Sequence, residues 1–485
     1  MDRDRLTLAD AAEEYRRWTP EVLGALLEYL DAIPELPVGP SVEPGWLLER
    51  LPSDPPGAPE DFAGVLEDLR ELIRPALVNW QAPGFHGYFP ANTSWPAALA
   101  DFMAAGLGQQ GMVWATSPAA TELEMRMLDW VARLCGLPEH FRHDHSGPGG
   151  GVIQDSASSG TLVALLAGRE RCGGRPALAD QVVYHSVEAH SSVIKGARVA
   201  GFAEEHIRAV PTDEDLAMRP DELARMLDAD LASGLVPAAV VATIGTTSTM
   251  AVDPVPGIVD VLDGRFDPGG PTRPWLHVDA AMAGAATICP EHRHLLEGVE
   301  RVDSYLFNPH KWWGITFDCT TMWVADRAPV IDALSITPPY LRNEATESGA
   351  VVDFRDWQVP LGRRFRALKV WFVLRAIGPG AIADMVRHHC AEADWLAARV
   401  ESSEHWDLAV PHRLNLVCIR HRAGSDTTRA AAAELNASGK VLLTVTEVAG
   451  EAVLRLSVGS PSVTHDDVVR LWSLVQEAGA GAYIQ

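Results

Sequence analysis

The chain has 485 residues, of which 47% are hydrophobic and 22% charged, and it carries a formal net charge of −25. The length predicts two or three structural units with large apolar cores, and the charge argues against nucleic acid and anionic membranes as partners. No apolar run reaches the ~18 residues of a membrane span, the start is unlike a signal peptide, and six scattered cysteines fit neither a zinc site nor a disulfide framework, so we expect a reduced cytoplasmic setting.

Residues 1–94 are expected to form a helical arm. Apolar residues recur at helical spacing over 8–32 and again over about 60–78, with proline-rich segments between the two stretches. The arm is too short and interrupted to be a separate enzyme. We therefore expect it to pack on another surface, such as that of a second subunit.

Residues 95–372 are predicted to form a large α/β domain. Short runs rich in Val, Ile and Ala, such as 181–185, 238–244 and 275–279, alternate with amphipathic stretches. Uninterrupted apolar strands between helices predict a mainly parallel sheet covered on both faces. In such sheets the chemistry lies beyond the carboxyl ends of the strands.

Residues 373–485 are predicted to form a small α+β C-terminal domain. Strand candidates are 414–420, 441–447 and 452–457, and a closing helix begins near Thr464. Thr464 and Asp467 resemble a capping box in which Asp replaces Glu.

The first candidate for chemistry is Lys311, in the run Phe-Asn-Pro-His-Lys-Trp-Trp-Gly that ends at Gly314. Only four of the 40 basic residues are lysine, and lysine, unlike arginine, can form a Schiff base. Most lysines are solvated surface residues, and we read Lys195, Lys369 and Lys440 in that way. Lys311 differs because its aromatic neighbours would lower its pKa and make it a usable nucleophile.

Asp279 ends the apolar run 275–279 and is followed by a series of small residues. It could simply cap the next turn. Alternatively it projects into the crevice at the strand ends, where the small residues leave space for a flat ligand. An aspartate paired with a pyridinium nitrogen is what a pyridoxal phosphate site requires.

Three further segments contain polar residues beside predicted elements. Ser156, with small residues after it, precedes an apolar helix, which is typical either of plain N-capping or of a phosphate-binding helix N-terminus. We read the glycine-rich 147–151 as a flexible lead into a strand. His190 follows a strand, where a lone histidine is more often structural. His140, His143 and His145 lie in a Gly/Pro-flanked loop without helical pairing, so we predict no metal site.

Taken together, these segments resemble the group II pyridoxal phosphate-dependent decarboxylases, most closely the aromatic-L-amino-acid decarboxylases. The resemblance spans about Trp80 to His389. Its motifs include Ser117-Pro-Ala-Ala-Thr-Glu-Leu-Glu124, His277-Val-Asp-Ala-Ala281, Asn308-Pro-His-Lys311 and Asp356-Trp-Gln-Val-Pro-Leu-Gly-Arg-Arg-Phe365.

The resemblance implies a type I aminotransferase-like fold with a seven-stranded sheet, a homodimer, and pyridoxal 5'-phosphate as cofactor. It implies that Lys311 holds the cofactor, that Asp279 pairs with its ring nitrogen and that His190 stacks on the ring. The other implied cofactor contacts are Ser156, Ala157, Ser158, Thr246, Ala281, Asn308 and His310.

The resemblance further implies that Tyr340 protonates the α-carbon after carbon dioxide leaves, and that polar residues 342–350 form a lid. The implied substrate pocket comprises Trp80, Tyr88, Phe89, Met112 and Gly362. Its apolar walls favour an aromatic amino acid, and Gly362 leaves space for an indole. At position 91, many animal relatives have a threonine where this chain has an alanine. The loss of that hydroxyl argues against a catechol substrate and favours tryptophan or phenylalanine.

The expected activity is thus decarboxylation of an aromatic L-amino acid to its amine. The nearest alternative is an aromatic acetaldehyde synthase, a relative in which the loop tyrosine or the stacking histidine is typically replaced, whereas Tyr340 and His190 are both present here. A decarboxylase for another amino acid is a further alternative. A noncatalytic pyridoxal-binding regulator would call for a basic helix-turn-helix arm, and the arm of this chain is acidic.

Overall fold

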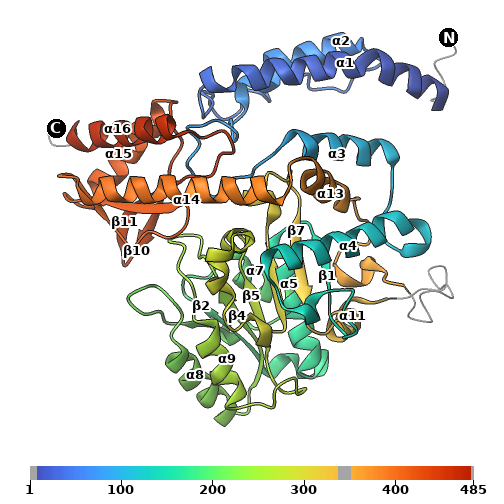
Figure 1. Cartoon of the computed structure of the whole chain (residues 1–485), viewed down its shortest axis with the longest axis vertical. Coiled ribbons are helices and arrows are strands. Elements are labelled where there is room, and N and C mark those ends of the chain that lie inside the picture. The colour runs from blue at the N-terminus through green and yellow to red at the C-terminus, as the bar shows by residue number, and fades with distance from the viewer. Residues whose placement is uncertain (1–7, 337–350, 482–485) are drawn as a thin grey trace.

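A computed structural model describes residues 8–336 and 351–481. Its large body contains a seven-stranded sheet in the order β1-β7-β6-β5-β4-β2-β3 (Figure 1). The strands are β1 (Gly150–Gln154), β2 (Gln181–Ser186), β3 (Ile207–Val210), β4 (Val236–Thr243), β5 (Trp275–Asp279), β6 (Ser304–Phe307) and β7 (Thr320–Val324). Strands β2 to β6 pair in parallel, while β7 runs antiparallel to β1 and β6. The predicted mainly parallel seven-stranded sheet is confirmed.

Helices cover both faces of this sheet, as the apolar runs predicted. In β4, Val240 and Ala242 belong to one apolar core, while Ala239 and Val241 belong to the other. The helices of this part of the chain are α3 (Trp95–Leu107), α4 (Pro118–Cys135), α5 (Ala157–Arg171), α6 (Gly174–Ala177), α7 (Ser192–Ala200), α8 (Pro220–Ala232), α9 (Val255–Asp263), α10 (Pro309–Trp312), α11 (Ala328–Leu334) and α13 (Ala367–Ala376). Helix α4 starts with Pro118 and ends at Gly136, whose φ of 77° is one that glycine adopts without strain.

The prediction for the glycine-rich run 147–151 was wrong for its last two residues. The run 147–151 was expected to be a flexible lead, but Gly150 and Gly151 are buried within β1 itself. A Cβ on Gly150 would lie 2.7 Å from the His143 ring, and one on Gly151 would lie 2.7 Å from the Trp323 ring. These glycines therefore allow close packing of side chains against the strand.

The C-terminal part forms a second, antiparallel sheet in the order β10-β11-β9-β8. Its strands are β8 (Trp406–Leu408), β9 (Leu416–His421), β10 (Thr444–Val448) and β11 (Glu451–Ser457), packed with α14 (Pro379–Glu401), α15 (Ser425–Ala437) and α16 (His465–Gly481). The expected capping box before α16 is present, because Asp467 Oδ2 accepts the Thr464 N–H at 2.9 Å and the Asp467 N–H donates back to Thr464 Oγ1. The domain boundaries at 94 and 372 stay a prediction.

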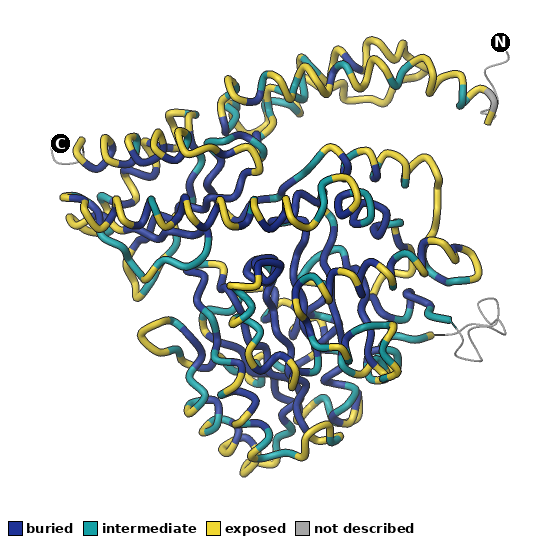
Figure 2. The backbone as a smooth tube through the Cα atoms, in the orientation of Figure 1, coloured by how far each residue is buried: buried dark blue, intermediate teal, exposed yellow. Residues whose placement is uncertain are grey.

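The helical arm contains α1 (Leu8–Ala32) and α2 (Phe62–Asp68), the latter continued by a π-helical and a 3-10 turn to Ala76. Both helices lie along one side of the molecule, beyond the C-terminal helices and α3 (Figure 1). Much of the arm is exposed (Figure 2). No helix among residues 8–336 and 351–481 is long and apolar enough to cross a membrane.

Candidate functional site

Lys311 and Asp279 meet at the carboxyl edge of the large sheet. Asp279 is the last residue of β5 and pairs in register with Leu306 of β6, and Lys311 follows β6 on the short helix α10. Burial lowers the pKa of Lys311, the Asp279 carboxylate opposes that shift, and the Arg455 guanidinium adds to it. The site thus contains an amine that loses its proton more easily than an ordinary lysine.

Asp279 is held in place by its own turn. It is 4% exposed, and its Oδ1 accepts the Ala281 N–H at 3.0 Å. Ala281 in turn accepts the Asn308 N–H at 3.0 Å, which joins the residue after β5 to the residue after β6. Among the described residues, Oδ2 of Asp279 has no hydrogen-bond partner, so it is available to a ligand. The alternative of a purely capping aspartate leaves this second oxygen unexplained.

His190 lies at the same edge, between β2 and α7. Burial lowers its pKa, the Asp279 carboxylate raises it and Lys311 lowers it, so all three groups share one electrostatic environment. Its Nδ1 accepts the Ser192 N–H at 3.2 Å. The proton of the neutral ring therefore lies on Nε2, which is left as a hydrogen-bond donor.

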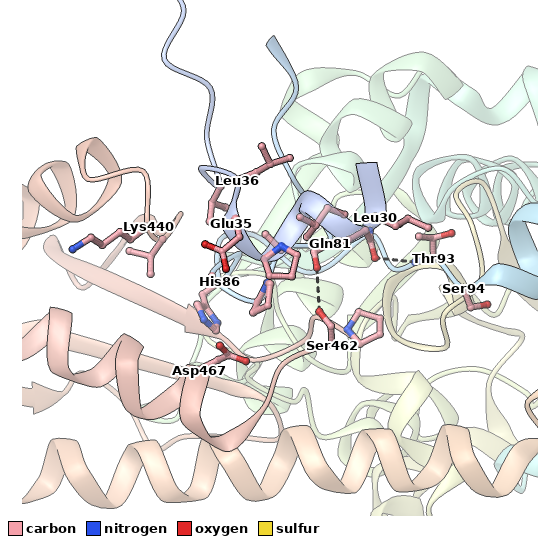
Figure 3. A pocket seen from close by; sticks show the side chains of 18 of the residues that line it. Leu30, Glu35, Leu36, Gln81, His86, Thr93, Ser94, Lys440, Ser462 and Asp467 are labelled. Carbon is pink, nitrogen blue, oxygen red and sulfur yellow. Dashed lines mark hydrogen bonds between the residues drawn. The ribbon is translucent and has the colours of Figure 1, made fainter. Parts of the chain in front are cut away.

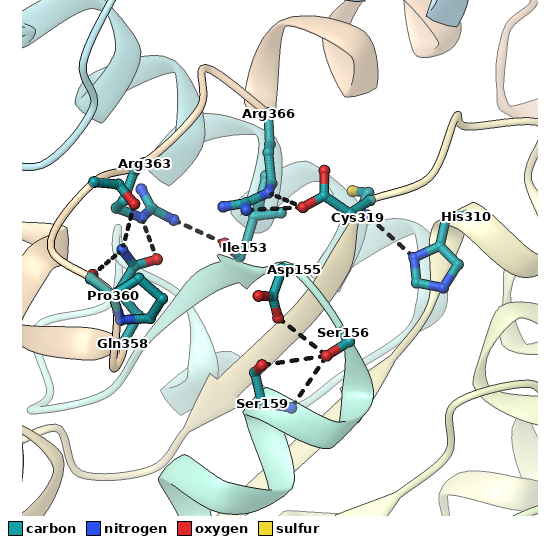
Figure 4. Close-up of polar contacts among 12 residues, drawn as sticks. Ile153, Asp155, Ser156, Ser159, His310, Cys319, Gln358, Pro360, Arg363 and Arg366 are labelled. Carbon is teal, nitrogen blue, oxygen red and sulfur yellow. Dashed lines mark hydrogen bonds and ion pairs between the residues drawn. The ribbon is translucent and has the colours of Figure 1, made fainter. Parts of the chain in front are cut away.

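The Ser156 turn forms the N-terminus of α5. Ser156 Oγ accepts the Ser159 N–H at 3.2 Å and donates to Asp155 Oδ1 at 3.0 Å (Figure 4). Ala157 and Ser158 open the helix, where backbone N–H groups have no partner within the helix and attract an anion. Ser156 is thus an N-cap, as expected, on a helix end that is also suited to a phosphate.

Asn308 and His310 flank Lys311 and are both buried. Asn308 Oδ1 accepts the Thr320 hydroxyl at 2.7 Å, and His310 Nδ1 accepts the Cys319 N–H at 3.1 Å. Burial and the neighbouring Lys311 lower the pKa of His310 to about 4, so its ring is neutral at physiological pH. Thr246, buried after β4, accepts the Ala251 N–H at 3.0 Å and so completes the row of predicted residues at the strand ends.

These residues fit pyridoxal 5'-phosphate. A carboxylate oxygen without a partner suits the ring nitrogen, a buried amine suits the aldehyde carbon, and the α5 N-terminus suits the phosphate. Ala281, which has no side chain beyond Cβ, leaves room for a flat ring beside Asp279.

The predicted substrate pocket falls into two groups. Trp80 and Tyr88 stack with ring centroids 5.9 Å apart, and the Phe89 ring lies 5.3 Å from Lys311 Nζ. Met112 and Gly362 lie on a separate rim, where Met112 O accepts the Arg355 N–H and a Cβ on Gly362 would lie 3.5 Å from the Gln110 amide. Among the described residues, no hydrogen bond or ring contact joins the two groups. Tyr340 and the predicted lid lie outside the described residues.

A buried ion pair holds the β1 edge of the large sheet, next to this site. Arg363 and Glu124 are 1% and 3% exposed and form a two-point pair at 2.7 and 2.9 Å. Glu124 also accepts the Ile153 N–H and Arg363 donates to the Ile153 carbonyl, so the pair covers the outer edge of β1. Figure 4 shows Arg363 and Arg366 on either side of this strand, just before the Ser156 turn. These motif residues thus support the site without lining it.

Sequence reasoning missed two basic residues. Lys369 was read as a surface lysine, but it is 1% exposed and pairs with Asp101 at 3.3 Å. Arg455 was not singled out, yet it is 3% exposed and its charge acts on Lys311. A signal for Arg455 was present, since it is a charged residue in the middle of the apolar strand 452–457.

A separate cavity lies elsewhere in the molecule. A cavity of about 790 Å³ opens between the arm and the C-terminal helices, lined by Leu27, Leu30, His86, Lys440 and Asp467 among others (Figure 3). Its lining does not include Lys311 or Asp279, so it is distinct from the site described above.

Comparison with known proteins places the chain in a family. The family model described as "Pyridoxal-dependent decarboxylase conserved domain" matches residues 44–422. The aromatic-L-amino-acid decarboxylase of Bos taurus is 40% identical over 480 residues, covering 97% of this chain and 96% of its own. The phenylacetaldehyde synthase of Arabidopsis thaliana is 39% identical over 478 residues, covering 96% of each chain.

The solved structure of Oryza sativa TDC with PLP and tryptamine superimposes with a TM-score of 0.93 at 36% identity, covering 97% of this chain and 98% of that one. The likeness therefore extends over the arm, the large sheet and the C-terminal part together.

Proposed function

The chain belongs to the pyridoxal-dependent decarboxylases, and from this we propose that it converts an aromatic L-amino acid into the arylalkylamine and carbon dioxide. It is a carboxy-lyase that uses pyridoxal 5'-phosphate. The observation that carries the proposal is the partly buried Lys311 beside Asp279, with the Phe89 ring 5.3 Å from its amine. An aromatic ring at this position suits a substrate whose own side chain is a flat ring.

The bound cofactor supplies the electron sink that makes loss of carbon dioxide feasible. Each protein group has a separate task around it. Lys311 would hold the cofactor covalently, Asp279 would keep its ring nitrogen protonated, and the N–H groups of Ala157 and Ser158 would hold its phosphate. These tasks are carried over from the family motif, and the local geometry supports them.

His190 and the aromatic wall act on the substrate side. The Nε2–H of His190 has no acceptor among the described residues and can orient a bound polar group, because Nδ1 is occupied by Ser192. Phe89, which is 8% exposed, presents apolar surface beside Lys311, and the stacked rings of Trp80 and Tyr88, 37% and 57% exposed, lie next to it in the chain. Tyr340 is proposed to return a proton to that carbon.

The choice among aromatic substrates is proposed from two small residues. Ala91 lacks the hydroxyl that would bind a catechol, and Gly362 leaves its side-chain space open, with the Gln110 amide as the nearest neighbour. Both features favour tryptophan or phenylalanine over dihydroxyphenylalanine.

The test is a competition assay. The purified holoenzyme receives tryptophan, phenylalanine, tyrosine and dihydroxyphenylalanine together, and the amines are measured by mass spectrometry. We expect the amine in equal yield with carbon dioxide, with tryptamine or phenethylamine formed first. Cofactor binding without turnover of any of the four would contradict the proposal and favour a regulator.

A second candidate activity is aromatic acetaldehyde synthesis, favoured by the 39% identity to the phenylacetaldehyde synthase. Such an enzyme would release aldehyde, ammonia and hydrogen peroxide in equal amounts. The presence of His190 and Tyr340 favours the amine product. Peroxide formed in step with aldehyde would decide for the synthase.

We also propose that the protein is a homodimer. Leu23, Leu26, Leu27 and Leu30 of α1 are 44–50% exposed, and Phe102 and Leu107 of α3 are about half exposed. Contiguous apolar surface of this kind marks an interface, and the cavity between the arm and the C-terminal helices continues it (Figure 3). Light scattering should give the mass of two chains, and Leu27→Asp with Leu30→Asp should weaken the dimer.

A cytoplasmic setting is proposed from the thiols. All six cysteines are free and buried, and burial raises the pKa of Cys135 to about 12. Protonated, unpaired thiols suit a reducing compartment.

A further inference from the structure

The aromatic side chains beside Lys311 belong to an irregular stretch of the chain, residues 80–94, which we call the wall segment. It carries Trp80 and Tyr88, whose rings stack, and Phe89, whose ring lies 5.3 Å from the Lys311 amine. The segment forms neither a helix nor a strand. Tyr88 has a φ of 53°, a left-handed conformation that a bulky residue keeps only when the surrounding structure holds it. Contacts with other groups must therefore fix the shape of the wall segment.

The side chain of Gln81 joins the two ends of the wall segment. Its Nε2 donates to the Ala91 carbonyl at 2.7 Å, and its Oε1 accepts the Thr93 N–H at 3.3 Å. The backbone carbonyl of Gln81 accepts the Ser460 and Ser462 hydroxyls at 3.1 and 3.2 Å. Figure 3 shows Gln81 between Thr93 and Ser462. One glutamine thus closes the loop that carries the aromatic rings and ties it to the C-terminal part of the chain.

The far end of the wall segment is bonded to the turn that carries Lys311. The Asn92 N–H donates to the His310 carbonyl at 3.1 Å, and the Ser94 hydroxyl donates to the Gly314 carbonyl at 2.6 Å. These two bonds lie on either side of Lys311 in the chain. The position of the wall segment relative to the lysine amine is therefore set at the same end of the segment that Gln81 holds.

We infer that Gln81 is a positioning residue, which holds the aromatic rings of the wall segment against Lys311 before the substrate arrives. Among the described residues, its side chain bonds only to the backbone of Ala91 and Thr93, so it acts through the wall segment and not on the reacting atoms. The inference rests on the proposed function, because the ring of an aromatic substrate is what these side chains would receive.

This role has a specific kinetic consequence. Without the two bonds of Gln81, the wall segment would spend part of its time in other conformations, and the unfavourable backbone of Tyr88 would favour such a departure. A substrate would then bind only the fraction of molecules whose rings are in place, and its apparent affinity would fall by that fraction. Once the ring is bound the wall is in place again, so KM should rise while kcat stays unchanged.

The first experiment compares Gln81→Met with the wild-type holoenzyme. We expect KM for phenylalanine and for tryptophan to rise roughly 5- to 30-fold, as for the loss of two neutral hydrogen bonds, with kcat unchanged. Gln181→Met is the matched control, because Gln181 Nε2 also bonds two backbone groups, the Arg169 and Cys172 carbonyls at 2.9 and 3.0 Å. Gln181 begins β2, at the opposite edge of the sheet from Lys311, so its loss should cost stability alone.

The second experiment needs no decarboxylation. O-methylhydroxylamine and O-benzylhydroxylamine condense with the bound cofactor through the same aminooxy group and displace Lys311, and only the second brings a ring. The rates are followed by the absorbance of the holoenzyme. We expect the wild type to prefer the benzyl compound, and Gln81→Met to lose that preference by roughly 5- to 30-fold, with the methyl compound and Gln181→Met unaffected. An unchanged preference in Gln81→Met would overturn the inference.

The third experiment uses only the wild type and does not depend on the folding of a variant. Hydrogen exchange is measured at the Thr93 N–H, whose acceptor is Gln81 Oε1. We expect exchange in the unliganded holoenzyme to be roughly 100-fold slower than in an unstructured peptide. Exchange at the unstructured rate, slowing only when O-benzylhydroxylamine is added, would show that the ligand orders the wall segment and that Gln81 does not.

The remaining outcomes separate the inference from the proposed function. If Gln81→Met loses cofactor absorbance and kcat as well, Gln81 has a merely structural role and the inference fails. If none of the aromatic amino acids is decarboxylated but Gln81→Met still loses the benzyl preference, the proposed function fails and the positioning role stands. If amines are formed and Gln81→Met leaves both KM and the benzyl preference unchanged, only the positioning role fails.

Discussion

Replacing Glu124 by glutamine should destabilise the protein strongly, although the two side chains have the same shape. The carboxylate accepts three hydrogen bonds, from Ile153 N–H at 2.8 Å and from the two Arg363 nitrogens at 2.7 and 2.9 Å. In the amide, an NH₂ group would face one of the guanidinium nitrogens, and Arg363 would be left as a buried charge with 1% exposure.

The magnitude follows from that burial. Removing one partner of a buried ion pair costs about 3–5 kcal/mol, because the remaining charge stays desolvated. The Arg420–Glu451 pair, whose side chains are 46% and 56% exposed, should contribute no more than about 1 kcal/mol. The double variant Glu124→Met with Arg363→Met removes both charges but leaves the Ile153 N–H and carbonyl without these partners, so it should recover only part of the loss.

Guanidinium-induced unfolding, followed by tryptophan fluorescence, measures the effect for Glu124→Gln, Arg420→Met, the double variant and the wild type. Retention of cofactor absorbance gives a second measurement, since the pair holds Ile153 just before the Ser156 turn. The reasoning fails if Glu124→Gln unfolds at the same denaturant concentration as Arg420→Met.

Three further predictions concern the lysines, the histidines and one glycine. Lys311→Ala should abolish turnover and the visible absorbance of bound cofactor, whereas Lys369→Met should keep the absorbance and lose only stability, because Lys369 is paired with Asp101; both are read from the absorption spectrum and an amine assay. Burial lowers the pKa of His86, His277, His310 and His389 to about 4, so the folded state binds fewer protons than the unfolded state, and stability should fall as pH drops from about 6.5 towards 4. Each histidine contributes up to about 1.4 kcal/mol per pH unit to this loss of stability. Burial raises the pKa of Asp253 to about 6, so below that pH its protonation offsets the effect of one histidine. Denaturation midpoints measured between pH 7.5 and 5 test this, and His277→Asn should reduce the dependence of stability on pH. Gly168→Ala should cost about 1–3 kcal/mol, because a Cβ there would lie 2.7 Å from the Ala238 carbonyl, while Gly380→Ala, which meets nothing within 4 Å, should be neutral or stabilising in a thermal melt.

Periodicity predicted the elements that are long or uniformly apolar. The helix expected over 8–32 is α1, and the run 275–279 is β5 to the residue. The closing helix follows Thr464, whose side chain and that of Asp467 cap it as the spacing predicted. In these segments the local signal and the packing agree, so no tertiary information was needed.

The predictions fell short where distant segments decide the local structure. Gly150 and Gly151 looked flexible because glycine usually is, but His143, Trp323 and Trp357 close over them from other segments. The direction of β7, antiparallel to both neighbours, is set by its pairing and not by its sequence. Lys369 looked like a surface residue because its partner Asp101 is 268 positions away.

The candidate site was predictable where the order of the strands in the parallel sheet brings its residues to one edge. Asp279, His190, Thr246 and Lys311 each follow a strand of one parallel sheet, so their meeting at one edge is a consequence of topology. Arg455 reaches the site from a different sheet, and only the packing of the C-terminal part against Ser248 and Phe89 reveals it.

Lys369 and the partly buried Lys311 show why burial alone does not make an amine reactive. Lys369 is more deeply buried than Lys311, and its charge acts on His310, the residue beside Lys311. Lys369, however, forms an ion pair with Asp101 at 3.3 Å, so its amine already has a partner within the protein. Lys311 has no carboxylate in hydrogen-bond contact among the described residues. Burial lowers its pKa, and Asp279, which raises it, and Arg455, which lowers it, act from a greater distance. The contrast lies in the charges around each lysine, and those charges come from residues that no motif around Lys311 contains.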